Sequence, residues 1–226
     1  NINDNSSVVS AEIMYSVNGG SYQSVAMNNL GGASWTGTIP ATNSEGERVN
    51  YYIQAVDDGV DQDGIETGTY PFDSSFDQLE YITRDGDLFI SDIQYTNWFA
   101  GNSPFDGCEV TVTGIVTAGD EVYGADEVYA IQSESGAWNG IIFDGWEGAQ
   151  FTLGDEVTVT GTVEEYDPVW HYRWDNNTKL TNVANSTLNS SGNSVLPVTV
   201  TTANLAEESN DVESYEGCLV TIANVT

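Results

Sequence analysis

The sequence predicts an all-β protein built from two consecutive units. Runs that alternate apolar and polar residues recur about every ten residues, which is the spacing of short strands. No stretch shows the 3.6-residue apolar period of an amphipathic helix. The length of 226 residues, with 39% hydrophobic residues, is sufficient for two packed cores.

The first unit, residues 1–84, has the pattern of a β-sandwich. Residues 11–17 place Ile13, Tyr15 and Val17 on one face of a strand. Asn18-Gly19 is a hairpin-turn sequence, after which the chain is expected to return as a second strand. The return strand and three further strands are expected at 22–27, 33–39, 49–56 and 78–83.

Three strings of this unit resemble the immunoglobulin- and fibronectin-III-like modules of secreted bacterial proteins. They are YSVNGGSYQSVAM, WTGTIPA and VNYYIQAVDD, which begin at residues 15, 35 and 49. The resemblance implies one or two further strands before residue 11, where only about ten polar residues stand. The sheet is therefore expected either to lack an edge strand or to receive one from elsewhere.

The second unit, residues 85–226, has the pattern of a small, strongly bent barrel. Val alternates with Thr in two of its strands, and Gly114 and Gly161 stand in mid-strand, where they permit a bend. The expected strands are 88–95, 108–117, 127–133, 137–143, 157–163 and 169–174.

This unit resembles the oligonucleotide/oligosaccharide-binding (OB) barrels of bacterial extracellular nucleases and surface proteins. The strings that carry the resemblance are SPFDGCEVTVTGIVT, YAIQSESGAWNGIIFDG and LGDEVTVTGTVEEYD, from residues 103, 129 and 153. The fold prediction is therefore an Ig-like β-sandwich followed by an OB-like barrel.

The string from Phe105 to Val112 recurs in similar form from Tyr215 to Ile222, which makes the second copy either the closing strand of the barrel or the first strand of a following module. Cys108 and Cys218 occupy the same place in the two copies. If the strands lie side by side, a disulfide would close a loop of about 110 residues and contribute about 4–5 kcal/mol. The alternative is two buried thiols.

The composition restricts location and partners. Four Lys and Arg against 35 Asp and Glu give a net charge of −31. Nucleic-acid binding normally needs a basic surface, so nucleic acid is not an expected partner. The absence of a long apolar run argues against membrane insertion. The Thr-, Ser- and Asn-rich, Lys-poor composition predicts an extracellular or cell-surface location, with either a solvated acidic coat or acidic clusters that hold Ca²⁺.

Two groups of residues are candidate binding sites. Aromatic residues gather in the second unit and could form a stacking platform for sugar rings, or could pack internally: Trp138, Trp146, Trp170, Tyr172 and Trp174. Alternating carboxylates in the first unit could hold a cofactor Ca²⁺, or could form a solvated turn: Asp57, Asp58, Asp61 and Asp63.

The sequence does not point to an enzyme. His171 is the one histidine, and no nucleophile-elbow, metalloprotease or phosphate-loop motif is present. We expect a non-catalytic structural or adhesive module of a bacterial extracellular or cell-surface assembly, for example a fibre subunit, that contacts other modules or copies of the same protein. The alternative is an accessory module that binds substrate, such as a glycan, for a neighbouring nuclease or other hydrolase.

Overall fold

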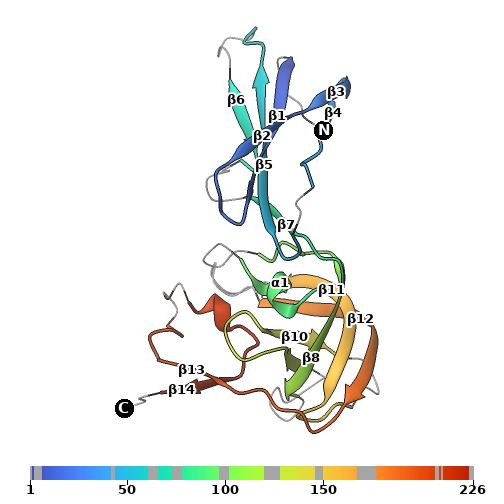
Figure 1. Cartoon of the computed structure of the whole chain (residues 1–226), viewed down its shortest axis with the longest axis vertical. Coiled ribbons are helices and arrows are strands. Elements are labelled where there is room, and N and C mark those ends of the chain that lie inside the picture. The colour runs from blue at the N-terminus through green and yellow to red at the C-terminus, as the bar shows by residue number, and fades with distance from the viewer. Residues whose placement is uncertain are drawn as a thin grey trace. The chain divides into compact units, whose positions relative to one another are not determined.

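A computed structural model shows a protein built almost entirely of strands, which confirms the predicted all-β class (Figure 1). The chain forms two compact units, Asn1–Asp85 and Gly86–Thr226, and the predicted boundary differs from this division by one residue. The structure describes residues 2, 7–41, 44–60, 66–72, 78–96, 102–119, 128–145, 150–166, 177–206, 209 and 211–223.

Unit 1 consists of one five-stranded antiparallel sheet and a separate two-stranded ribbon. The sheet has the order β2-β1-β5-β6, and β7 pairs with the other end of β5. β3 and β4 form the ribbon. The strands are β1 Val8–Val17, β2 Gln23–Ala26, β3 Asn28–Gly31, β4 Ser34–Thr36, β5 Arg48–Asp57, β6 Thr67–Tyr70 and β7 Leu79–Ile82.

The strand pattern of unit 1 explains the sheet. Ala11, Ile13 and Tyr15 of β1 are buried on one face, as the alternation predicts. Asn18 and Gly19 both have positive φ, which the hairpin between β1 and β2 requires. Within the described part of unit 1, the only strands besides this sheet are those of the ribbon, so a second full sheet of a sandwich is not seen there.

Unit 2 is a closed five-stranded barrel with a short helix before it and a small parallel strand pair after it. Its elements are α1 Ile90–Gln94, β8 Glu109–Ala118, β9 Val128–Gln132, β10 Gly140–Asp144, β11 Glu156–Tyr166, β12 Asn177–Ser190, β13 Val198–Val200, the 3-10 helix η1 Glu213–Tyr215, and β14 Val220–Ile222.

The barrel closes in the order β8-β9-β10-β12-β11, in which β11 pairs back with β8. β10 and β12 run parallel, and the other neighbouring strands run antiparallel. The pairing of β11 with β12 shifts register between Thr160 and Thr162, opposite Asn182 with its positive φ. Gly161 lies at this bulge, where an added Cβ would stand 2.9 Å from the Thr181 carbonyl oxygen. At Gly114 the pairing of β8 with β11 continues in regular register.

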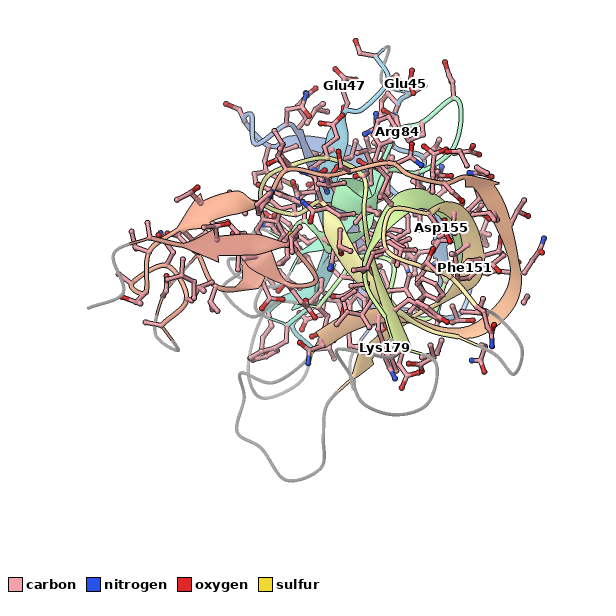
Figure 2. The ribbon with its side chains drawn as sticks, turned by 90° about the horizontal axis from the view of Figure 1, so that it is seen from below. Glu45, Glu47, Arg84, Phe151, Asp155 and Lys179 are labelled. Carbon is pink, nitrogen blue, oxygen red and sulfur yellow. The ribbon has the colours of Figure 1, made fainter. Side chains whose placement is uncertain are left out.

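Apolar side chains fill the barrel. Ile131, Ile141 and Leu180 are wholly inaccessible to solvent, and Tyr129 stacks on Phe143 with ring centroids 5.3 Å apart. Phe151, which is labelled in Figure 2, belongs to the segment before β11. Its ring packs edge-on against Tyr129.

The segment 88–95 is not a strand as predicted; α1 occupies its centre. The Asp92 carboxylate accepts a hydrogen bond from the Phe89 N–H at 2.9 Å, which closes the first turn. Ile90 and Ile93, three residues apart, lie on one helical face and are fully buried in the barrel core. No helix among the described residues is long and apolar enough to cross a membrane.

The end of the barrel also differs from the prediction. β12 was not anticipated, because most of its 14 residues are polar and few are buried. This segment is a strand because it pairs with β11 on one side and with β10 on the other. The predicted strand 169–174 lies outside the described residues.

Candidate functional site

An open cleft of about 810 Å³ lies on the sheet of unit 1. Its floor includes Ile53 and Ala55 of β5, its sides include Trp35 of β4 and Tyr70 of β6, and Asp57 lies at its margin. The Trp35 indole N–H is buried and has no hydrogen-bond partner in the described part of the chain. Apolar side chains beside an unsatisfied hydrogen-bond donor, the Trp35 indole N–H, are suited to binding a peptide segment.

The strand β6 borders this cleft and presents an open edge. Among the described residues, β5 is the one strand that pairs with it. The Asp57 N–H donates to the Glu66 carbonyl at 3.3 Å, and Gly68 and Tyr70 continue this register opposite β5. Because hydrogen-bonding direction alternates along an antiparallel strand, Thr67 and Thr69 direct their main-chain groups to the open edge.

The core of unit 1 is small. Four apolar residues are buried in its described part, namely Ala11, Ile13, Tyr15 and Val49. The barrel of unit 2 has a cluster of thirteen. Next to the cleft, Tyr70 and Phe72 are 64% and 96% exposed. Unit 1 therefore leaves apolar surface uncovered where a second layer would stabilise it.

The first two residues of the predicted calcium site have structural roles. Asp57 is 4% exposed, and its Oδ1 accepts hydrogen bonds from the N–H groups of Gly59 and Glu66 at 2.9 and 3.0 Å. Asp58 accepts one from the Val60 N–H at 3.2 Å. Such bonds are typical of a carboxylate-stabilised turn. Asp61 and Asp63 lie outside the described residues, within which no group of three potential metal ligands occurs.

One member of the predicted aromatic platform, Trp138, is described, and it is half-buried. Trp138, with a φ of 68°, lies in the β9–β10 connection, and its ring contacts Tyr95 edge-on at 5.4 Å. The main-chain N–H of Trp138 donates to the Ser214 carbonyl at 2.6 Å. The other four residues, Trp146, Trp170, Tyr172 and Trp174, lie outside the described residues.

The predicted disulfide between Cys108 and Cys218 is not formed, because both residues are free thiols. The repeated string produces the same local turn twice: the Cys108 N–H donates to Phe105, and the Cys218 N–H donates to Tyr215. The strands that follow then separate. β8 enters the barrel, whereas β14 pairs with β13 outside it, so the second copy does not close the barrel.

The second turn docks a carboxyl cluster against the barrel. Glu216 Oε1 is buried and has no hydrogen-bond partner among the described residues. Burial, and then repulsion by Glu213 and Glu165, raises the pKa of Glu216 well above its usual value. Burial and repulsion by Glu165 raise the pKa of Glu213 to about 7. Glu165 itself accepts hydrogen bonds from the Ser103 N–H and the Thr178 hydroxyl, each at 2.8 Å.

Sequence reasoning missed both the open cleft and this cluster. In a chain with 35 acidic residues, nothing in the sequence distinguishes Glu213 and Glu216 from the exposed carboxylates. The available signal was the repeated Gly-Cys turn, since it showed that the chain near Gly217 follows a specified path. No protein-family model, curated protein or solved structure matches this chain.

Proposed function

We propose that this chain is a non-catalytic structural module of a bacterial extracellular or cell-surface assembly, in which unit 1 accepts a β-strand from a neighbouring copy of the chain. The observation that carries the proposal is the apolar cleft beside the open edge of β6. An open edge with unpaired main-chain groups is a template for an added strand.

The cleft favours an extended segment with alternating apolar side chains. Its main-chain groups would pair with Thr67 and Thr69, and its apolar residues would cover Ile53 and Ala55. The carboxylates of Asp57 and Glu66 at one end of the cleft would repel an acidic segment.

Within the described part of the chain, β14 fits this description. It is uncharged, and Val220 and Ile222 share one of its faces. Ile222 is 43% exposed, and β14 is the second member of a two-stranded sheet. We therefore propose β14 of a second copy as the strand that enters the cleft.

Two finer points of fold belong to the same proposal. Unit 1 would be an immunoglobulin-like module whose sheet is completed by the added strand. Unit 2 would be an OB-type barrel, because its strands close as a five-stranded Greek-key arrangement with a parallel β10–β12 pair.

A proline variant tests the open edge. Thr69→Pro removes a main-chain donor that points away from β5, so it should leave the β5–β6 pairing intact and abolish strand addition. The matched control is Ser24→Pro in β2 at the other edge of the sheet. The Met27 N–H donates to the Ala11 carbonyl, and in this register Ser24 also points outward.

The readout is molar mass by size-exclusion chromatography with light scattering, across protein concentration. Salt should promote association, because it screens the charge of −31. We expect the wild type and Ser24→Pro to form oligomers in about 1 M NaCl, and Thr69→Pro to remain monomeric. A wild-type protein that is monomeric throughout, or a Thr69→Pro protein that assembles like the wild type, would refute the proposal.

The barrel topology favours a second candidate function, an accessory module that binds a glycan for a neighbouring hydrolase. In OB-type barrels the ligand face uses the second and third strands and the loops on either side. Trp170, Tyr172 and Trp174 belong to the connection between β11 and β12. Titration of neutral glycans and single-stranded DNA, with and without Ca²⁺, tests this function. Loss of glycan binding in Trp174→Ala would support this function, and the absence of binding to every ligand tested would exclude it.

A further inference from the structure

The segment 211–219, which we call the cover, docks on the hairpin end of β9 and β10. Its Ser214 carbonyl accepts a hydrogen bond from the Trp138 N–H at 2.6 Å. Its Leu219 N–H donates to Gln132 Oε1 at 2.7 Å. Gln132 is fully buried beneath the cover. These contacts hold the cover through directional bonds as well as through packing.

Two glycines meet where the cover approaches the barrel. A Cβ added to Gly140 would lie 2.3 Å from the main-chain carbon of Gly217. Gly217 adopts a φ of 62°, and Glu216 before it has φ −56° and ψ 135°, which together form a type II turn. This turn directs the Glu216 side chain toward the barrel strands β11 and β12, where Thr178 and Glu165 contribute to its environment.

The charged and titratable groups that act on Glu216 within the described residues are acidic. Glu213 belongs to the cover and Glu165 to β11. The Cys218 thiol of the cover is also close enough to be affected by the Glu216 charge. Lys179, the basic residue of β12, pairs with Asp144 at 2.9 Å. An ionised Glu216 would therefore place an uncompensated charge in a buried site that already holds carboxylates.

We infer that the cover is a proton-dependent latch: it stays docked over Gln132 and Gly140 while Glu216 is protonated, and it loosens when Glu216 ionises. The inference does not depend on the proposed strand addition, because it concerns one copy of the chain. Its consequence is a change in accessible surface, since release of the cover exposes the hairpin end of β9 and β10.

The direction of the pH effect follows from linkage. The docked state raises the pKa of Glu213 and Glu216, so it binds protons more tightly than the released state. Docking is therefore strongest at acidic pH. It weakens as the pH rises from the usual carboxyl value of 4.5 through about 7, the raised value of Glu213. The pKa of Glu216 is raised in the same direction, so its ionisation also weakens docking as the pH rises.

Hydrogen exchange of the intact chain tests the latch. The Leu219 and Trp138 amides report docking directly, because each is hydrogen-bonded across the contact. After correction for the intrinsic pH dependence of exchange, we expect their protection in the wild type to fall at least tenfold between about pH 5 and pH 8. Glu216→Gln, which stays neutral, should remain protected at both pH values. The control Glu164→Gln removes an exposed carboxylate on β11 and should follow the wild type.

A second measurement on the unmodified protein keeps the test independent of how the variants fold. The rate of Cys218 alkylation relative to that of exposed Cys108 should rise as the cover opens, beyond the rise expected from thiol ionisation. Protection that is independent of pH in the wild type would overturn the inference. So would a Glu216→Gln protein that folds and loses protection at the same pH as the wild type.

Discussion

Replacement of Gly140 by alanine should detach the cover from the barrel. Gly140 does not have a positive φ, so alanine is compatible with its main chain. The added Cβ, however, would lie 2.3 Å from the carbon and oxygen of Gly217 and 2.6 Å from the Cys218 nitrogen, and all three are main-chain atoms. Ordinary contact begins at 3.4 Å, so the cover must move by about 1 Å.

A displacement of this size breaks two hydrogen bonds that hold the cover. It would lengthen the Trp138–Ser214 and Leu219–Gln132 bonds from 2.6 and 2.7 Å to about 3.6 and 3.7 Å, beyond the ordinary range of a hydrogen bond. Each such bond contributes about 1 kcal/mol net, which gives about 2 kcal/mol for the pair. This free energy corresponds to an increase of about 30-fold in the population of the detached state.

Hydrogen exchange at acidic pH, where the wild-type cover is docked, measures this population. The Leu219 and Trp138 amides of Gly140→Ala should exchange about 30-fold faster than in the wild type. Gly86→Ala is the control, because its added Cβ meets no atom within 4 Å. If Gly140→Ala keeps wild-type protection, the described approach of cover and barrel is incorrect.

Four further predictions concern stability and chemistry. Ile131→Ala removes a fully buried side chain and should lower the free energy of unfolding of unit 2 by about 2–5 kcal/mol in urea titrations, whereas Leu188→Ala, at a site 52% exposed, should change it by less than about 0.5 kcal/mol. Thiol titration of the denatured protein without reductant should give two free thiols, and a mass corresponding to a disulfide would contradict this count. In the native state the Cys108 thiol should react faster than the Cys218 thiol, because burial raises the pKa of Cys218. Asp57→Ala should cost unit 1 about 1–3 kcal/mol by removing two part-buried hydrogen bonds, those from the Gly59 and Glu66 N–H groups, and Asp57→Asn, which keeps an acceptor oxygen, should cost less. Calcium should raise the melting temperature of the wild type but not of Asp57→Ala if this loop holds the ion; an equal effect on both would exclude the site.

The parts of the fold that the sequence predicted are those encoded in local alternation. β8 and β11 bury every second residue along most of their length, and β1 does so from Ala11 to Tyr15, so these strands could be placed without tertiary information. β12 could not be placed in this way. Its outward face is polar, and its long strand depends on hydrogen bonds from β11 and β10.

The short helix α1 shows the complementary limit. Residues 88–95 contain enough apolar residues for a strand, but Asp92 bonds back to Phe89 and the isoleucines lie three residues apart. Over five residues these features do not produce a clear helical period, so the strand prediction was wrong.

The candidate sites were difficult to predict for a different reason. The cleft depends on β6 having no second neighbouring strand within the described part of the chain, and the carboxyl cluster depends on a long-range contact between the turn at Gly217 and Gly140. Neither feature corresponds to a pattern of residues that are adjacent in the sequence. The cysteine pairing failed on the same ground, because two similar strings form the same turn and then pair with different strands.

The cover and the proposed donor strand are adjacent, and this predicts a coupling between pH and assembly. β14 begins at Val220, directly after the cover, so release of the cover at neutral pH would free the chain that leads into the strand. Association of the wild type should therefore increase between about pH 5 and pH 8, while Glu216→Gln should associate equally weakly at both. Net charge alone predicts the opposite trend, because deprotonation makes a chain of charge −31 more repulsive. Light scattering at constant ionic strength separates the two effects: a fall in association with rising pH would mean that the cover does not control the strand, even if both proposals hold individually.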